Sequence, residues 1–207
     1  MGDELFALDS DLGIQELIGL GPDVLAAAAR EARRGGTVAD ISEVALRPTV
    51  PRPGSVRDGA CFLDHVRGCL RAIGNSGDLP DVWHHVPAFY FANPAALLGG
   101  RDDVPVFPGA KWFDFEAEIG VVIGRPGRDL SPDQAMDHIA DYTIFCDWTA
   151  RDLQLLDNAQ GIGQAKGKDG APTLDPCLVT SDELDPTDIG GAASTSTISA
   201  PRIPPAM

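Results

Sequence analysis

Two glutamates in the segment 113–123 (FDFEAEIGVVI) carry the strongest chemical signal in this sequence. Aromatic and β-branched residues alternate there with polar ones, which predicts a strand. Glu116 and Glu118 then share one face, about 7 Å apart along the strand, and can converge on one cation. A solvated outer face of an amphipathic strand would give the same pattern. The opposite face would be wholly apolar, with Phe113, Phe115, Ala117, Ile119, Val121 and Ile123.

Two further carboxylates could join such a site. Asp147 follows the apolar segment 142–146 and precedes Trp148, where a strand-end loop would present its side chain. Asp58 lies seven residues before His65, and seven helical residues turn through about 700°, back to nearly the same face. If Asp58 begins a helix, its carboxylate and the imidazole of His65 address one point. An ordinary helix cap at Asp58 and a surface histidine at 65 are the plain alternatives.

The ligand types favour a hard cation. Four carboxylates without an accompanying Cys or His pair match Mg²⁺ best, with Ca²⁺ or Mn²⁺ as alternatives. Zinc usually takes clusters of His and Cys, which are missing here. His84 and His85 are adjacent and would point to opposite faces of a strand, and His138 falls on a predicted surface helix. We assign none of these three histidines to the metal.

Charge and composition exclude several classes of partner. The chain has 207 residues, of which 43% are hydrophobic and 23% charged, and its formal net charge is −15. A protein with this much negative charge repels phosphate backbones and anionic membranes. We therefore expect no nucleic-acid or membrane partner. No apolar run reaches the roughly 20 residues that span a bilayer, and the acidic N-terminus is not a signal peptide. The four cysteines form no regular framework, which favours a reduced, cytoplasmic protein.

The N-terminal part of the chain separates from the rest by composition. Residues 1–45 are predicted to form a small helical appendage, because Gly21-Pro22-Asp23 opens a run of strong helix formers that Gly35-Gly36 closes. Residues 46–54 contain three prolines and are predicted to form an extended connector. The last segment, residues 190–207, has no periodicity and little to bury, so we expect disorder.

Helical and strand patterns alternate between these ends. Helical spacing is expected over residues 58–73 and, after a Ser131 cap, over 131–140. The pattern Thr149-Ala-Arg-Asp152 loosely matches a capping box and predicts another helical turn. Aromatic and β-branched residues predict strands over three further segments, 87–92, 142–146 and 176–180.

Several motifs, in order, resemble one known family. The segment FDFEAEIGVVIGRPGRDLSPDQAMDHIADYTIFCDWTARDLQ, followed by GQAKGKD and PCLVTSDEL, is similar to the central block of the fumarylacetoacetate hydrolase family. The resemblance runs from about Arg52 to Leu184. It implies an α+β, mainly β fold: an incomplete mixed β-sandwich roll of the family type, with residues 55–189 as a partial catalytic domain. Members of the family are commonly homodimers, so the resemblance implies a homodimer if the domain is complete. The family domain continues beyond the LVTSDEL motif, so we expect this chain to be C-terminally truncated.

The resemblance also implies roles for individual residues. Glu116, Glu118 and Asp147 correspond to metal ligands of the family, and Asp58 to a further ligand. His65 corresponds to a general base. Two side chains, Gln154 and Lys168, correspond to groups that contact substrate oxygens, and Lys168 would also stabilise developing negative charge.

The function implied is that of a metal-dependent hydrolase. It would cleave a C–C bond in a small diketo or 2-oxo acid, such as an acylpyruvate or a fumarylacetoacetate-like compound. A base beside the metal, His65, favours hydrolysis, because water must lose a proton to attack a carbonyl. The alternatives are a lyase of the same family, either a 2-oxo-enoate hydratase or an oxaloacetate-type decarboxylase, and an inactive remnant that retains only metal binding.

Overall fold

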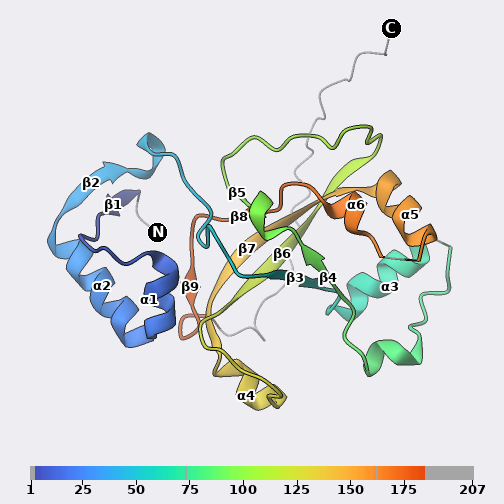
Figure 1. Ribbon diagram of the computed structural model, residues 1–207, viewed down its shortest axis with the longest axis horizontal. Helices are drawn as coiled ribbons and strands as arrows, with labels where there is room; N and C mark the ends of the chain where they lie inside the picture. Colours follow the sequence, from blue (N-terminus) through green and yellow to red (C-terminus); the bar gives the residue numbers. More distant parts are fainter. Residues whose placement is uncertain (1–2, 73, 162, 185–207) are drawn as a thin grey trace, which may run out of the picture.

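The computed structural model describes residues 3–72, 74–161 and 163–184 (Figure 1). The N-terminal part contains strand β1 (Glu4–Phe6), helices α1 (Ile14–Leu20) and α2 (Pro22–Arg34), and strand β2 (Thr37–Asp40), which pairs antiparallel with β1. Helix α2 begins at the predicted proline, directly after Gly21 with its positive φ of 100°, and ends at Gly35, as the start and stop signals indicated. The small sheet β1–β2 was not predicted, so residues 1–45 are not purely helical.

The connector that follows contains no helix, which agrees with its three prolines. After the short 3₁₀ helix η1 (Ile41–Glu43), residues 44–55 form no helix or strand. The predicted disordered segment, residues 190–207, lies outside the described residues, as do residues 185–189 of the predicted catalytic domain.

A five-stranded mixed sheet forms the centre of the molecule. Its strands β6 (Phe113–Ile123) and β7 (Ile139–Ala150) pair antiparallel along almost their whole lengths. Short strands extend the sheet beyond β7: β8 (Thr173–Leu174) pairs with β7, β5 (Leu98–Gly99) runs parallel to β8, and β9 (Val179–Thr180) pairs with the other end of β7. The strand predicted over 113–123 is confirmed, and the one predicted over 142–146 is longer at both ends. The predicted α+β fold around a mixed sheet is confirmed.

A second, two-stranded sheet lies beside the first and corrects the prediction for residues 58–73. Strand β3 (Val56–Gly59) pairs antiparallel with β4 (Phe89–Ala92), and Asp58 faces Tyr90 across the pair. Helix α3 (Leu63–Ala72) begins only after this strand. The argument that Asp58 and His65 share one helical face is therefore wrong. Its physical reason is tertiary: β3 gains a backbone ladder with the aromatic strand β4, which residues 56–59 could not gain in a helix.

The remaining helices are short and flank the sheets: α4 (Pro132–Met136), α5 (Arg151–Ala159), α6 (Ala165–Lys168), and the 3₁₀ turns η2 (Asp81–His84) and η3 (Pro94–Ala96). Ser131 caps α4 as predicted. The predicted capping role of Thr149 is wrong, because Thr149 lies within β7 and is fully buried. Helix α5 instead begins at Arg151, and the carboxylate of Asp152 accepts hydrogen bonds from the backbone of Lys111 and Trp112.

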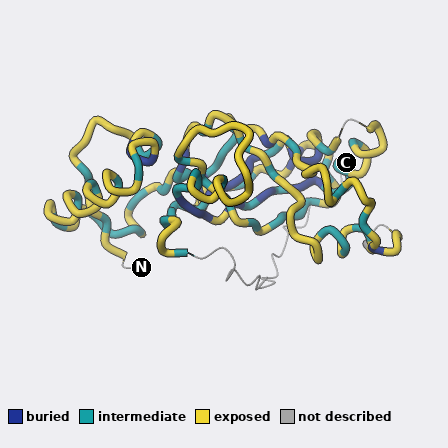
Figure 2. Tube along the Cα trace, turned by 90° about the horizontal axis from the view of Figure 1, so that it is seen from below, coloured by how far each residue is buried: buried dark blue, intermediate teal, exposed yellow. Residues whose placement is uncertain are grey.

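Burial is concentrated along the central sheet, whereas the N-terminal helices are mostly exposed (Figure 2). One core cluster contains Val50, Phe145 and Leu174. The burial of β6 reverses the usual expectation. From Glu116 to Ile123, the acidic positions are half-buried, while the apolar positions Ala117, Ile119, Val121 and Ile123 are exposed. Within the described part of the chain, no helix is long and apolar enough to cross a membrane.

Candidate metal centre

Four carboxylates from three strands converge on one point. Asp58 comes from β3, Glu116 and Glu118 from β6, and Asp147 from β7, and one ligand oxygen of each lies within 4.8 Å of all the others. Glu116 faces Asp147 directly across the β6–β7 ladder, so these two side chains share one face of the sheet. The structure thus brings together the four residues that we predicted as metal ligands.

This carboxylate face is turned into the protein. Asp147 is only 1% exposed, and Glu116 and Glu118 are half-buried. The alternative of a solvated outer face is therefore wrong for these two glutamates. Carboxylates removed from water in this way require positive charge or protons nearby.

Lys168 supplies one positive charge from α6. Its ammonium donates to Glu116 Oε2 at 2.9 Å and to Asp147 Oδ2, and the residue is 3% exposed. Its position depends on close packing of α6 on α5. A Cβ at Gly167 would lie 2.5 Å from the backbone nitrogen of Gln154, and the backbone N–H of Gly167 donates to Asp157 at 2.7 Å. Lys168 thus lies in the centre itself and is not a solvated loop lysine.

Arg151 supplies a second positive charge that the sequence analysis missed. Its Nε donates to Asp114 Oδ2 at 2.9 Å, and its Nη1 donates to Glu116 Oε1. Arg151 opens α5 four residues after Asp147, and Asp114 shares the strand face of Glu116. This spacing was visible in the sequence, but nothing in it shows that α5 folds back over β6.

Tyr90 is the other side chain that the sequence analysis missed. Its hydroxyl lies 2.7 Å from Asp147 Oδ2 and 3.1 Å from Asp58 Oδ2, and its ring lies 5.6 Å from Lys168 Nζ. Burial, followed by the negative charges of Asp147 and Asp58, raises the pKa of the Tyr90 phenol, so it remains a protonated donor. In the segment PAFYFA, Tyr90 is the one residue with a side-chain hydroxyl, and this was the available signal.

The electrostatics leave negative charge that these residues do not neutralise. Burial, then the charges of Asp58, Asp147 and Glu116, raises the pKa of Glu118 to about 9. Burial also raises the pKa of Asp147 to about 6, although Lys168 opposes this. Four carboxylates face a single buried ammonium, and the guanidinium of Arg151 is shared with Asp114. An all-oxygen donor set with excess negative charge fits a hard divalent cation such as Mg²⁺, Ca²⁺ or Mn²⁺.

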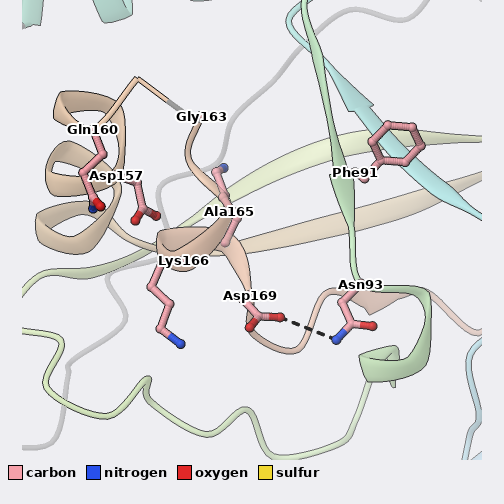
Figure 3. Close-up of a pocket in the computed structure, with 9 residues that line it drawn as sticks. Phe91, Asn93, Asp157, Gln160, Gly163, Ala165, Lys166 and Asp169 are labelled. Carbon is pink, nitrogen blue, oxygen red and sulfur yellow. Dashed lines mark hydrogen bonds between the residues drawn. The ribbon is translucent and has the colours of Figure 1, made fainter.

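A cavity of about 470 Å³ opens beside the centre, between α5, α6 and the end of β4 (Figure 3). Lys168 lines it, and so do Phe91, Asn93 and Lys166. Asn93 Nδ2 donates to Asp169 Oδ1 at 3.5 Å, and both residues line the cavity. Lys168 is the residue that the cavity shares with the carboxylate cluster.

The remaining two predicted site residues lie farther from the carboxylates. Gln154, on α5, donates to Gln164 at 2.7 Å and accepts from Arg151 at 3.3 Å. It is therefore connected to Glu116 only through Arg151, which binds both side chains. His65 is exposed on α3, where its Nε2 lies 3.5 Å from Cys69 Sγ. No hydrogen bond joins His65 to any of the four carboxylates in the described part of the chain. Its role as a base remains a prediction without geometric support.

Comparison with known proteins shows to which family the chain belongs. Residues 55–198 match the profile of the domain described as fumarylacetoacetate (FAA) hydrolase C-terminal. This chain belongs to the fumarylacetoacetate hydrolase family. The match covers the carboxylates, Lys168 and Arg151, so the predicted resemblance is confirmed.

Relatives within the family have different activities. An oxaloacetate tautomerase of Bacillus subtilis, YisK, is 32% identical over 146 residues, which are 70% of this chain and 46% of the relative. A 2,4-didehydro-3-deoxy-L-rhamnonate hydrolase of Sphingomonas is 31% identical over 188 residues, 88% of this chain and 62% of the relative. The chain spans about half the length of the first curated relatives that it matches.

A solved structure supports the fold. The fumarylacetoacetate hydrolase of Exiguobacterium antarcticum superposes with a TM-score of 0.61 over 87% of this chain and 59% of that protein, at 24% identity. At this identity the likeness shows the fold, and the family includes both hydrolases and tautomerases.

Proposed function

We propose that this protein is a divalent-cation-dependent enzyme that hydrolyses a C–C bond in a 2,4-diketo or related 2-oxo acid. The observation that carries the proposal is the convergence of Asp58, Glu116, Glu118 and Asp147 within 4.8 Å, beside a buried lysine. When bound there, a cation such as Mg²⁺ would act as a Lewis acid toward the oxygens of a chelating 2-oxo acid. The Sphingomonas hydrolase, which matches most of this chain, supports hydrolysis.

The chain's own residues would stabilise charge and orient the substrate. The ammonium of Lys168 is fixed by Glu116 and Asp147, so it can stabilise negative charge on a substrate oxygen without reorganising. Arg151 binds the other carboxylate oxygen of Glu116, Oε1. Gln154 would contact a substrate oxygen by exchanging its hydrogen bond to Gln164. These groups suit any reaction in which an enolate develops.

One observation favours a second candidate, keto–enol tautomerisation of oxaloacetate or a similar acid. Hydrolysis needs a base that activates water, and His65 is exposed on α3, with no hydrogen bond to the four carboxylates among the described residues. Tautomerisation needs only proton transfer at carbon and oxygen, with no attack by water. The Bacillus subtilis relative named as an oxaloacetate tautomerase supports this candidate.

A product assay separates the candidates. The full chain, loaded with Mg²⁺ or Mn²⁺, is incubated with an acylpyruvate, with a 2-hydroxydienoate and with oxaloacetate, each with and without a chelator. Release of pyruvate and a carboxylic acid from the acylpyruvate, abolished by the chelator, is the expected result. Decay of the oxaloacetate enol without cleavage would establish the tautomerase instead.

The other outcomes of the same assay contradict the proposal. Release of CO₂ from oxaloacetate would indicate a decarboxylase, and hydration of the dienoate a hydratase. Calorimetric binding of Mg²⁺ without turnover of any of the three substrates would indicate an inactive remnant. Glu116→Gln is the negative control, because it removes a proposed ligand while keeping the side-chain shape.

A further inference from the structure

The fourth carboxylate comes from a different sheet than the other three. Glu116, Glu118 and Asp147 lie on the five-stranded sheet, whereas Asp58 lies on the β3–β4 pair. These two sheets are not joined by backbone hydrogen bonds between strands in the described part of the chain. Figure 1 shows β3 and β4 as a separate ribbon beside β6 and β7. Something other than a ladder must keep Asp58 against the other ligands.

Tyr90 makes one such connection, beside a side-chain hydrogen bond between Asp58 and Glu118. It lies on β4 directly opposite Asp58 in the antiparallel register, so both side chains leave the small sheet on the same face. Its hydroxyl reaches Asp58 Oδ2 at 3.1 Å and Asp147 Oδ2 at 2.7 Å. Asp58 and Asp147 are 89 residues apart in sequence and carry like charges that repel each other. A donor shared between them offsets this repulsion at the place where the two sheets meet.

We propose that Tyr90 is a positioning residue for the metal centre: its hydroxyl holds the carboxylate of Asp58 beside Asp147 and thereby sets the affinity for the cation. This proposal rests on the proposed metal dependence and assigns a role that the ligand set alone does not contain. Groups that hydrogen-bond to metal ligands commonly change metal affinity by about 10–100-fold when removed.

The hydroxyl of Tyr90 contacts the two aspartates, whereas its ring contacts Lys168. A substitution that removes only the hydroxyl therefore tests the proposal. The ring lies 5.6 Å from Lys168 Nζ and keeps this contact in Tyr90→Phe, so the substitution removes only the hydroxyl. The chain contains two tyrosines, and the second offers a matched control. Tyr142 is 3% exposed on β7, and it lies an odd number of residues from Asp147, so it points to the opposite face of the sheet.

The first experiment is calorimetric titration of the full chain with Mn²⁺. We expect Tyr90→Phe to weaken binding about tenfold and Tyr142→Phe to change it less than about twofold. In an Asp58→Ala background, the same Tyr90→Phe change should cost less than about threefold, because the carboxylate that the hydroxyl positions is gone. Unchanged affinity in Tyr90→Phe, or an equal loss in the Asp58→Ala background, would overturn the proposal.

A second measurement does not depend on the folding of any Tyr90 variant. The wild-type chain labelled with 3-fluorotyrosine gives two ¹⁹F signals, which Tyr142→Phe assigns. As Mg²⁺ is added, the chemical shift of the Tyr90 signal should change until the site is saturated, whereas that of Tyr142 should stay constant. A Tyr90 chemical shift that does not change with Mg²⁺ contradicts the proposal. If the wild-type chain binds neither cation, the proposed function and this inference both fail. If it binds Mn²⁺ with the affinity of Tyr90→Phe, only the inference fails.

Discussion

Glu116 and Glu118 show how neighbouring residues of one type acquire different properties. They lie two positions apart on the same face of β6. Burial acts on both, but Lys168 and Arg151 outweigh it at Glu116 and lower the pKa of that carboxyl. The three other carboxylates surround Glu118 instead, and its pKa rises to about 9. Partners from α5 and α6, not the residue type, decide which glutamate is already neutralised.

The ligand role of Glu116 is testable by an isosteric change. Glu116→Gln should weaken Mg²⁺ binding by about tenfold or more, because an amide supplies less negative charge to a hard cation. Calorimetry measures the affinity. Asp114→Asn is the matched control, since it removes one charge from the same strand face outside the cluster, and it should cost less than about threefold. Equal losses in the two variants would count against a specific ligand role.

The position of His65 leads to the opposite expectation. Because His65 is exposed and its ring contacts Cys69, His65→Ala should leave Mg²⁺ affinity within about twofold of wild type. The same variant should keep any tautomerase activity. A loss of hydrolysis of more than about 100-fold in His65→Ala would show that α3 brings this imidazole to the substrate, as the family resemblance implied.

At the scale of elements, close packing of α6 against α5 positions Lys168. Gly167 has no room for a side chain, since a Cβ there would lie 2.5 Å from the backbone nitrogen of Gln154. Gly167→Ala should therefore push α6 outward, destabilise the fold by about 1–3 kcal/mol and weaken metal binding. Gly68→Ala on helix α3, where nothing lies within 4 Å, is the control and should be neutral or stabilising. Denaturant melts and calorimetry check both effects.

Besides Asp147, strand β7 contains another buried carboxylate, Asp141, which lies outside the metal centre. Asp141 is fully buried, and neither of its oxygens has a hydrogen-bond partner among the described residues. Burial, and then the charge of Asp182, raises its pKa. A group whose folded pKa is raised stabilises the fold below its unfolded pKa, and this contribution is lost as the pH rises through the folded pKa.

Asp141→Val should therefore stabilise the protein, and more so at high pH. A β-branched apolar residue of similar size suits this strand position, so we expect a gain of about 1–3 kcal/mol near pH 8 and a smaller gain near pH 4. Denaturant unfolding at the two pH values measures the difference. A gain that does not vary with pH would show that ionisation of the buried Asp141 carboxyl is not its cause.

At the scale of the whole molecule, one face of the central sheet is covered only in part: Tyr142 is buried there, whereas four aliphatic side chains are exposed. Ile119, Val121 and Ile123 of β6 and Ile144 of β7 are between 37% and 62% exposed, and β6 forms an edge of the sheet. Exposed apolar faces and long edge strands promote association. The predicted homodimer is one way to cover such a face and remains a prediction.

This exposure predicts the behaviour of the isolated chain. Ile144→Thr keeps the β-branched shape on the face opposite Asp147, so it should increase solubility and reduce aggregation while leaving Mg²⁺ affinity within about twofold. Light scattering and calorimetry measure the two effects. Unchanged aggregation would show that this sheet face is not where copies of the chain associate.

The sequence by itself determined the local elements and the types of ligand. Alternation predicted β6, the proline and glycine signals predicted α2, and Ser131 predicted the start of α4, because each of these depends on contacts between near neighbours. The family motifs also predicted Asp58, Glu116, Glu118 and Asp147 as one set. Their all-carboxylate chemistry already favoured a hard cation.

Tertiary structure alone decided which side of the sheet faces inward and how the ligands are held. Alternation separates the two faces of β6 but cannot say which one is covered. Here the carboxylate face is half-buried, and the apolar face is exposed from Ala117 to Ile123. Asp58 is positioned in the cluster by the pairing of β3 with β4, where it lies opposite Tyr90, 32 residues later in the chain. It does not share a helix with His65. Tyr90 and Arg151 joined the cluster for the same reason: contacts between distant segments depend on how elements pack, which residue spacing does not encode.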